Sequence, residues 1–140
     1  MRIRTVRSMI ASQVPFTVAA TAAVTEVAKT MRERNVGAMM VVDGTRLTGV
    51  FTERDALFRV LAAGRDPAAT RVGEVMTPSP QTIHPDKPFV DALRMMLEGG
   101  YRHVPVVDEG RVLGIVSVRD ALDPEVYEAK KELATREFDR

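Results

Sequence analysis

The chain has 140 residues, of which 45% are hydrophobic and 28% are charged, and its formal net charge is +1. These values are typical of one compact globular unit, argue against long disordered regions, and give no general attraction to nucleic acid or an anionic membrane. The sequence has no cysteine, which excludes disulfides, thiol nucleophiles and thiolate metal sites. We see no secretion signal and no apolar run of membrane-spanning length, so we expect a cytoplasmic protein with no membrane or nucleic-acid partner.

The first half of the sequence predicts a helix, a short extended piece, a second helix, two strands and a third helix. Thr5 is expected to cap the first helix, because its hydroxyl can accept a hydrogen bond from a first-turn amide, and Thr21 is expected to cap the second. The strand at 38–42 is apolar throughout, which is typical of a strand buried on both faces. These predicted elements occupy residues 6–10, 15–18, 22–34, 38–42, 46–51 and 53–63.

The second half repeats this order after a linker-like stretch at 65–71. Asp86 is expected to cap its main helix, with Pro88 near the helix start, where a missing amide proton costs little. A helix is expected to begin near Ser117, and a final charged helix to run from about 125 to 137. The other predicted elements occupy residues 72–76, 81–83, 87–98, 104–107 and 111–116.

An internal duplication explains this repetition. Residues 15–57 align without a gap with residues 80–122, at a shift of 65 positions, and 13 of the 43 pairs are identical. A repeat of this kind is one structural unit that buries its hydrophobic face only by packing against its neighbour. We therefore predict an α/β (α+β) fold in which two repeats pack about a pseudo-twofold axis. The predicted boundaries are 1–64 for repeat 1, 65–71 for the linker, 72–123 for repeat 2 and 124–140 for a C-terminal charged helix.

Four motifs follow one another in the second repeat: Glu74-Val75-Met76-Thr77-Pro78, Thr82-Ile83, His103-Val104-Pro105-Val106-Val107-Asp108 and Gly114-Ile115-Val116-Ser117-Val118-Arg119-Asp120. Together they resemble the CBS domain, named for cystathionine beta-synthase, and the two copies over about 5–123 resemble a CBS pair. The resemblance implies that each repeat is a small sheet flanked by two helices. It also implies a non-catalytic regulatory module that binds an adenosine nucleotide (AMP, ADP, ATP or S-adenosylmethionine) in clefts between the repeats, forms a homodimer and regulates another protein.

Two equivalent pairs, Thr52 with Asp55 and Ser117 with Asp120, lie where a strand is predicted to become a helix. The resemblance implies that each Asp accepts hydrogen bonds from both ribose hydroxyls, while the hydroxyl residue and the free helix amides meet phosphate. Alternatively, each pair is a capping box, in which the hydroxyl and the acid bind each other's backbone amides. Such boxes favour Glu or Gln, whereas both copies have Asp.

Basic residues near these pairs are candidate phosphate ligands. Arg54 and Arg119 either face phosphate or only balance the adjacent Asp. The resemblance implies that Arg102 and His103 reach a phosphate, Arg102 through a charge-assisted fork and His103 only when protonated. An ordinary surface Arg beside a packed His is the alternative. Repeat 1 has Gly and Ala at 37–38 in place of this basic pair, so we expect two unequal sites, with Arg102 making any polyphosphate contact.

The resemblance assigns adenine recognition to the backbone of two extended segments, Thr17 with Val18 and Thr82 with Ile83. A plain short strand is equally consistent with these residues. One further difference separates the repeats, because Glu53 of repeat 1 stands in the place of Val118 of repeat 2. An acid that points into the cleft would disfavour additional phosphate charge.

The residues favour neither catalysis nor a resident cofactor. The two histidines lack the spacing and carboxylate company of a metal site, and no Ser-His-Asp or paired-carboxylate arrangement emerges. A small nucleotide-converting enzyme is therefore the weakest hypothesis, and a ligand-free interaction or dimerisation module is the main alternative to a nucleotide sensor. The final helix could dock on a second subunit through its apolar residues Val126, Tyr127, Leu133 and Phe138.

Overall fold

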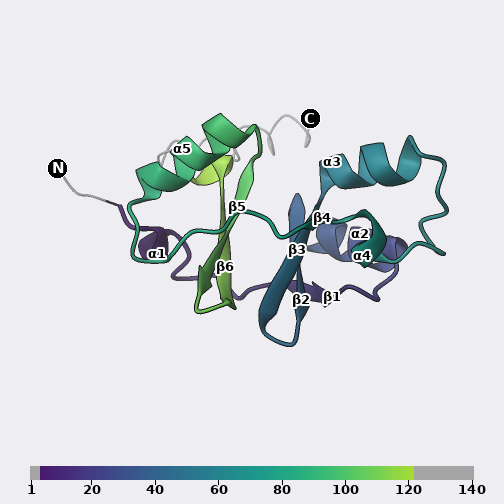
Figure 1. Ribbon diagram of the computed structural model, residues 1–140, viewed down its shortest axis with the longest axis horizontal. Coiled ribbons are helices and arrows are strands. Elements are labelled where there is room, and N and C mark those ends of the chain that lie inside the picture. Colours follow the sequence, from purple (N-terminus) through teal and green to yellow (C-terminus); the bar gives the residue numbers. More distant parts are fainter. Residues whose placement is uncertain (1–3, 122–140) are drawn as a thin grey trace, which may run out of the picture.

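Each repeat folds around an antiparallel hairpin, because the sequence twice supplies an apolar strand, a tight turn and a second strand. The computed structural model describes residues 4–121 and places the two hairpins side by side, with helices around them (Figure 1). The strands are β1 (Thr17–Ala19), β2 (Ala38–Asp43), β3 (Arg46–Thr52), β4 (Thr77–Pro78), β5 (His103–Asp108) and β6 (Arg111–Ser117). The helices are α1 (Val6–Met9), α2 (Val24–Arg34), α3 (Glu53–Asp55), η1 (Ala56–Leu61), α4 (Val72–Val75), α5 (Phe89–Gly99) and η2 (Val118–Ala121).

A pseudo-twofold axis passes between the hairpins. The strand order is β1-β2-β3-β6-β5, with β4 added to β3, and the only residue pair registered between β3 and β6 is Arg46 with Arg111. These two arginines occupy equivalent positions in the two repeats. Because residues on a twofold axis pair with their own equivalents, the Arg46–Arg111 pair marks the position of the axis. The flanking backbone bonds are also equivalent, and they run from Leu47 N to Gly110 O (3.4 Å) and from Val112 N to Thr45 O (3.2 Å). The predicted α/β fold of two symmetric repeats is confirmed.

The two hydrophobic cores exchange their first helices. Val6 and Ile10, which belong to the first half of the chain, lie in the core of repeat 2 with Phe89 of α5. Conversely, Val72 and Val75 of α4, which begin the second half of the chain, lie in the core of repeat 1. The boundaries predicted at 64 and 72 therefore describe the repeat in the sequence and remain a prediction. Each packed core contains residues from both sides of the 65–71 stretch.

Backbone hydrogen bonds fix this exchange. Val24 N at the start of α2 donates to Thr70 O (2.9 Å), and Phe89 N at the start of α5 donates to Arg4 O (2.8 Å). Each donor would otherwise be one of the unpaired first-turn amides of its helix. The segment before α4 thus supplies the acceptor for the first amide of α2, and the segment before α1 supplies the acceptor for the first amide of α5.

These bonds explain why two predicted helix caps are wrong. Thr5 does cap α1, since Ser8 N donates to Thr5 Oγ1 (3.2 Å), which confirms that prediction. Thr21 and Asp86 do not cap: α2 and α5 begin after Ala23 and Pro88, and neither start has a side-chain cap. The amides there are satisfied by distant carbonyls, and Asp86 instead accepts a hydrogen bond from the Arg7 guanidinium (3.0 Å).

Most other local predictions agree with the structure. The predicted strand at 38–42 is buried throughout, as its composition indicates. The predicted helix at 53–63 begins at Glu53 but continues from α3 into the π-helical η1. The helix expected near Ser117 is the short 3₁₀ turn η2, and the final charged helix lies outside residues 4–121. In the part of the chain that the structure describes, no helix is long and apolar enough to span a membrane.

The exchange makes a direct prediction about stability. Val6 and Val72 are both 0% exposed, so Val6→Ala and Val72→Ala should each lower the free energy of unfolding by about 2 kcal/mol through lost burial and a residual cavity. Urea unfolding followed by circular dichroism measures this change. Val14, which is 73% exposed, provides the matched control, and Val14→Ala should have almost no effect. A Val6→Ala variant as stable as Val14→Ala would contradict the packing of α1 on repeat 2.

Candidate functional site

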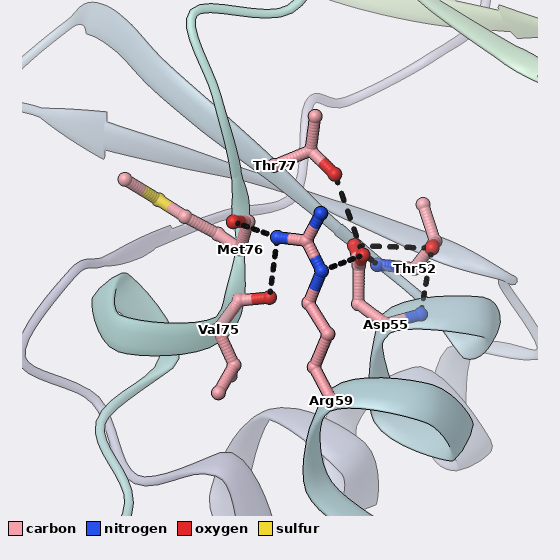
Figure 2. Close-up of polar contacts among 6 residues, drawn as sticks. All are labelled: Thr52, Asp55, Arg59, Val75, Met76 and Thr77. Atoms are coloured by element: carbon pink, nitrogen blue, oxygen red, sulfur yellow. Dashed lines mark hydrogen bonds and ion pairs between the residues drawn. The ribbon is translucent and has the colours of Figure 1, made fainter. Parts of the chain in front are cut away.

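The Thr52–Asp55 pair of repeat 1 forms a complete capping box where β3 becomes α3. Thr52 N donates to Asp55 Oδ2 (3.0 Å), and Asp55 N donates to Thr52 Oγ1 (3.2 Å) (Figure 2). The Thr52 hydroxyl also donates to Asp55 Oδ2 (3.1 Å). The capping interpretation is thus confirmed for repeat 1, while ribose binding by Asp55 remains a prediction.

The other carboxylate oxygen of Asp55 connects repeat 1 to the segment that leads into repeat 2. Thr77 Oγ1 donates to Asp55 Oδ1 (3.3 Å), and Arg59 Nε lies 3.6 Å from the same oxygen (Figure 2). Arg59 Nη1 in turn donates to the carbonyl of Met76 (2.8 Å) and lies 3.5 Å from that of Val75. Asp55 is only 6% exposed, so this network compensates the cost of burying its charge.

Two members of the network were absent from the sequence-based site. Arg59 lies four residues after Asp55 on the same helix, a spacing at which opposite charges are neighbours, so this contact was recoverable from the sequence. Thr77 gives no such signal, because its contact with Asp55 depends on β4 pairing with β3, where Thr77 lies opposite Val50. Only the three-dimensional structure reveals that second hydroxyl.

The equivalent pair in repeat 2 is held less tightly. Ser117 N donates to Asp120 Oδ2 (2.7 Å), and the Ser117 hydroxyl lies 3.5 Å from the same oxygen. Asp120 is half-buried, and the hydrogen bonds that reach it from residues 4–121 both go to Oδ2. Asp120 is therefore the more open of the two predicted anchors.

The extended segments predicted to read adenine each run from one half to the other. Residues 77–83 begin as β4 on repeat 1 and end at Ile83, which exchanges two backbone bonds with β5 (Ile83 N to Pro105 O and Val107 N to Ile83 O, both 3.0 Å). The Ile83 side chain is buried in the core, whereas Thr82 is exposed. An open hollow of about 540 Å³ beside Thr82 is lined by Gln81, Thr82, Met95, Glu98 and Gly99. The anchors Asp55 and Asp120 do not line it.

The segment that leads into β1 contacts the other half in the same way. The Gln13 side chain accepts from Ile115 N (3.0 Å) and donates to Ile115 O (2.8 Å) on β6. Four residues later, Thr17 and Val18 pair in parallel with β2. Thr17 is exposed and Val18 is half-buried against the repeat 1 core. Each extended segment thus starts beside the hairpin of the opposite repeat.

The three arginines predicted to bind phosphate are all exposed. Arg102 is exposed, and its carbonyl accepts from Val118 N (3.0 Å). Arg54 is exposed and lies over the ring of Phe58, with its guanidinium carbon 5.4 Å from the ring centroid. Arg119 is also exposed. Whether these three cations meet phosphate stays a prediction.

His103 lies at the junction of the two repeats. It pairs with Ser117 in the β5–β6 hairpin, and burial lowers the pKa of His103 below its ordinary value of 6.5. The Glu53 carboxylate of repeat 1 opposes this shift, Arg119 and Arg102 add to it, and Asp120 opposes it. All four side chains are therefore close enough to act on the imidazole charge.

Four apolar residues of β2 and β5 are buried in the two cores, namely Met39, Val41, Val104 and Val106. Over residues 4–121, no group of three or more His, Cys, Asp or Glu side chains is placed to hold a metal ion.

This arrangement, with two symmetric hairpins and an acid at each strand-to-helix junction, is matched by a known family. A family model of the CBS domain matches residues 6–62 and again residues 72–125. The chain belongs to the CBS domain family. Its two copies form a tandem CBS pair, as the sequence motifs indicated.

Two relatives illustrate the extent of the similarity. The chain is 34% identical over 110 residues to the mitochondrial CBS domain-containing protein CBSX3 of Arabidopsis thaliana, and the match covers 75% of this chain but 53% of the plant protein. The chain thus spans about half the length of that relative. It is 36% identical over 104 residues to the CBS domain-containing protein YhcV of Bacillus subtilis (strain 168), with 74% of each chain covered.

Two similar solved structures hold adenosine compounds. The CBS domain protein PAE2072 from Pyrobaculum aerophilum, complexed with AMP, has 26% sequence identity and a TM-score of 0.78, with 94% of this chain and 98% of that chain covered. The CBS domain pair of protein MJ0100, in complex with 5′-methylthioadenosine and S-adenosyl-L-methionine, has 28% identity and the same TM-score of 0.78, with 92% and 99% covered.

The network around Asp55 predicts a strong structural role for that residue. Asp55→Ala should lower the free energy of unfolding by about 3 kcal/mol, because it leaves the Thr52 amide and the Thr77 hydroxyl without their acceptor and Arg59 without its ion-pair partner. Asp86→Ala removes an exposed carboxylate whose pairing with Arg7 should contribute about 1 kcal/mol at most. Urea titration of the two variants beside the unmodified protein tests this difference. Equal losses in both would show that the buried network contributes no more than a surface ion pair.

Burial of His103 predicts a pH dependence of stability. The folded state holds the imidazole neutral at pH values where the unfolded chain protonates it, so the free energy of unfolding should fall as the pH drops through about 6.5. His103→Asn should reduce the loss of stability between about pH 7.5 and 5.5, which urea titrations at the two pH values measure. His84→Asn, at the other histidine, is the control. A pH dependence unchanged in His103→Asn would contradict the assignment.

Proposed function

We propose that this protein is a regulatory module, without catalysis of its own, that binds an adenosine nucleotide between its two CBS repeats and so reports energy or metabolite state. The observation that carries this proposal is the hydroxyl–Asp junction of repeat 1, where Thr77 of the segment that runs on to repeat 2 donates to Asp55, together with the equivalent Ser117–Asp120 junction of repeat 2. The AMP and S-adenosyl-L-methionine complexes of two structural relatives support the ligand class.

In this proposal one site is built on Thr52 and Asp55 and the other on Ser117 and Asp120. Each Asp accepts from the ribose hydroxyls, and each hydroxyl residue lies toward the phosphate. The contact between Thr77 and Asp55 supports a site that crosses the repeats, because it places the start of the 77–83 segment at the repeat 1 anchor. A ribose bound there would replace the Thr77 hydroxyl as a donor to Asp55.

The remaining predicted residues have complementary roles. The backbones of Thr82 with Ile83 and of Thr17 with Val18 read adenine. Arg102 and His103 bind phosphate at one site, and Arg54 and Arg119 complete the positive charge. The ligand binds one relative arrangement of the two repeats more tightly than another. The resulting shift in population toward that arrangement carries the signal to a regulated protein. A cytoplasmic location belongs to the same proposal.

Binding is expected to depend most clearly on Asp120, the more open anchor. Isothermal titration calorimetry with AMP, ATP and S-adenosylmethionine should detect at least one ligand, and Asp120→Ala should weaken it by about tenfold or more, since a hydrogen bond to a charged group contributes about 1.5–3 kcal/mol. A ligand present at a hundred times its dissociation constant should also raise stability by about 2.7 kcal/mol. Asp43→Ala, at an exposed strand end, should bind like the unmodified protein.

A ligand-free homodimerisation module is the competing function, and exposed apolar side chains favour it. Leu57, Phe58 and Leu61 are exposed on η1, and Val90 and Leu97 are exposed on α5. Unpartnered apolar surface of this kind marks interaction sites. If none of the three compounds binds at high micromolar concentration while light scattering shows a dimer, the sensor proposal fails and the dimerisation module replaces it.

A further inference from the structure

The start of β2 and the start of β5 meet across the pseudo-twofold axis. In both repeats the first amide after the strand-to-helix junction donates to the carbonyl just before the hairpin, from Glu53 N to Gly37 O (3.1 Å) and from Val118 N to Arg102 O (3.0 Å). Gly37 and Arg102 are equivalent positions, as are Glu53 and Val118. This backbone bond is therefore shared by the two repeats, whereas the side chains at these positions differ.

The side chains at these positions give the two equivalent junctions different charges. Repeat 2 has Arg102 where repeat 1 has Gly37, and repeat 1 has Glu53 where repeat 2 has Val118. Each exchange makes repeat 1 more negative by one charge, so the two equivalent junctions differ by two charges. The difference lies immediately beside both predicted ribose anchors.

Gly37 leaves the space that the Glu53 side chain occupies. A Cβ atom at residue 37 would overlap the Glu53 carboxylate and would lie 3.6 Å from His103 Cε1 of the other repeat. Glu53 is exposed, and its carboxylate lies beside the Gly37 backbone. The same carboxylate acts on the charge of His103, together with Arg119, Arg102 and Asp120.

We propose that Glu53 determines the charge of the ligand, so that the site anchored by Asp55 takes an adenosine derivative with a neutral or cationic 5′ group while the site anchored by Asp120 takes a phosphorylated one. This inference rests on the proposed function and adds a specificity residue to it. Glu53 is the first residue of α3 and Asp55 the third, so a phosphate chain on a ribose held by Asp55 meets the Glu53 carboxylate. Two like charges a few ångströms apart repel, and salt screens the repulsion where they are solvated.

Calorimetric titration of ATP, AMP and 5′-methylthioadenosine tests the proposal. In an Asp120→Ala background, which weakens the other site, Glu53→Gln should raise the affinity for ATP by about tenfold and that for AMP by less, with no change for the uncharged 5′-methylthioadenosine. The gain for ATP should shrink at about 1 M salt. Glu33→Gln is the matched control, because Glu33 is an exposed acid on α2 and the substitution makes the same change of charge.

The titrations distinguish failure of the Glu53 proposal from failure of the proposed sensor function. If the ligands bind but Glu53→Gln and Glu33→Gln behave alike, or if Glu53→Gln changes all three affinities equally, the proposed role of Glu53 is wrong and the sensor function stands. If no compound binds to any variant, both proposals fall. A readout that needs no ligand comes from NMR titration of His103, whose pKa should drop further in Glu53→Gln; an unchanged value would overturn the placement of the carboxylate.

Discussion

Val6 and Val72 have no exposed surface, and each lies in the core of the half that its position in the sequence does not predict. Neither half can complete its core, or satisfy the first amide of its main helix, without the segment supplied by the other. The contacts between the repeats near the candidate site depend on this exchange. It brings the Thr77 hydroxyl to Asp55 and the Gln13 side chain to Ile115 of β6.

The sequence was most informative where structure depends on neighbours along the chain. The buried strand at 38–42, the cap at Thr5 and the duplicated hairpins follow from composition and spacing, and the structure has all of them. The caps assigned to Thr21 and Asp86 were wrong, because distant carbonyls satisfy those helix starts. A single sequence carries no record of such pairing, and for that reason Thr77 was also missed.

The two anchors show how one motif can differ in availability. Asp55 and Asp120 have the same local bond from the residue three positions earlier. Asp55 is also held by Thr77 and Arg59, which makes it a structural joint between the halves as well as a candidate ligand contact. Any ligand at Asp55 competes with groups of the protein itself, so part of its binding free energy is spent on displacing them. Among residues 4–121, fewer groups of the protein compete for Asp120.

The single bridge between Arg46 and Arg111 has a mechanical consequence. Where ladders of several residue pairs join the strands within each hairpin, only this one pair registers between the hairpins, and its two side chains are both cationic. Like charges directly opposite each other weaken a pairing. The strand pairing between the hairpins is therefore far less extensive than the ladders within them. Anions in the surrounding solution, by screening the two arginines, should strengthen this pairing.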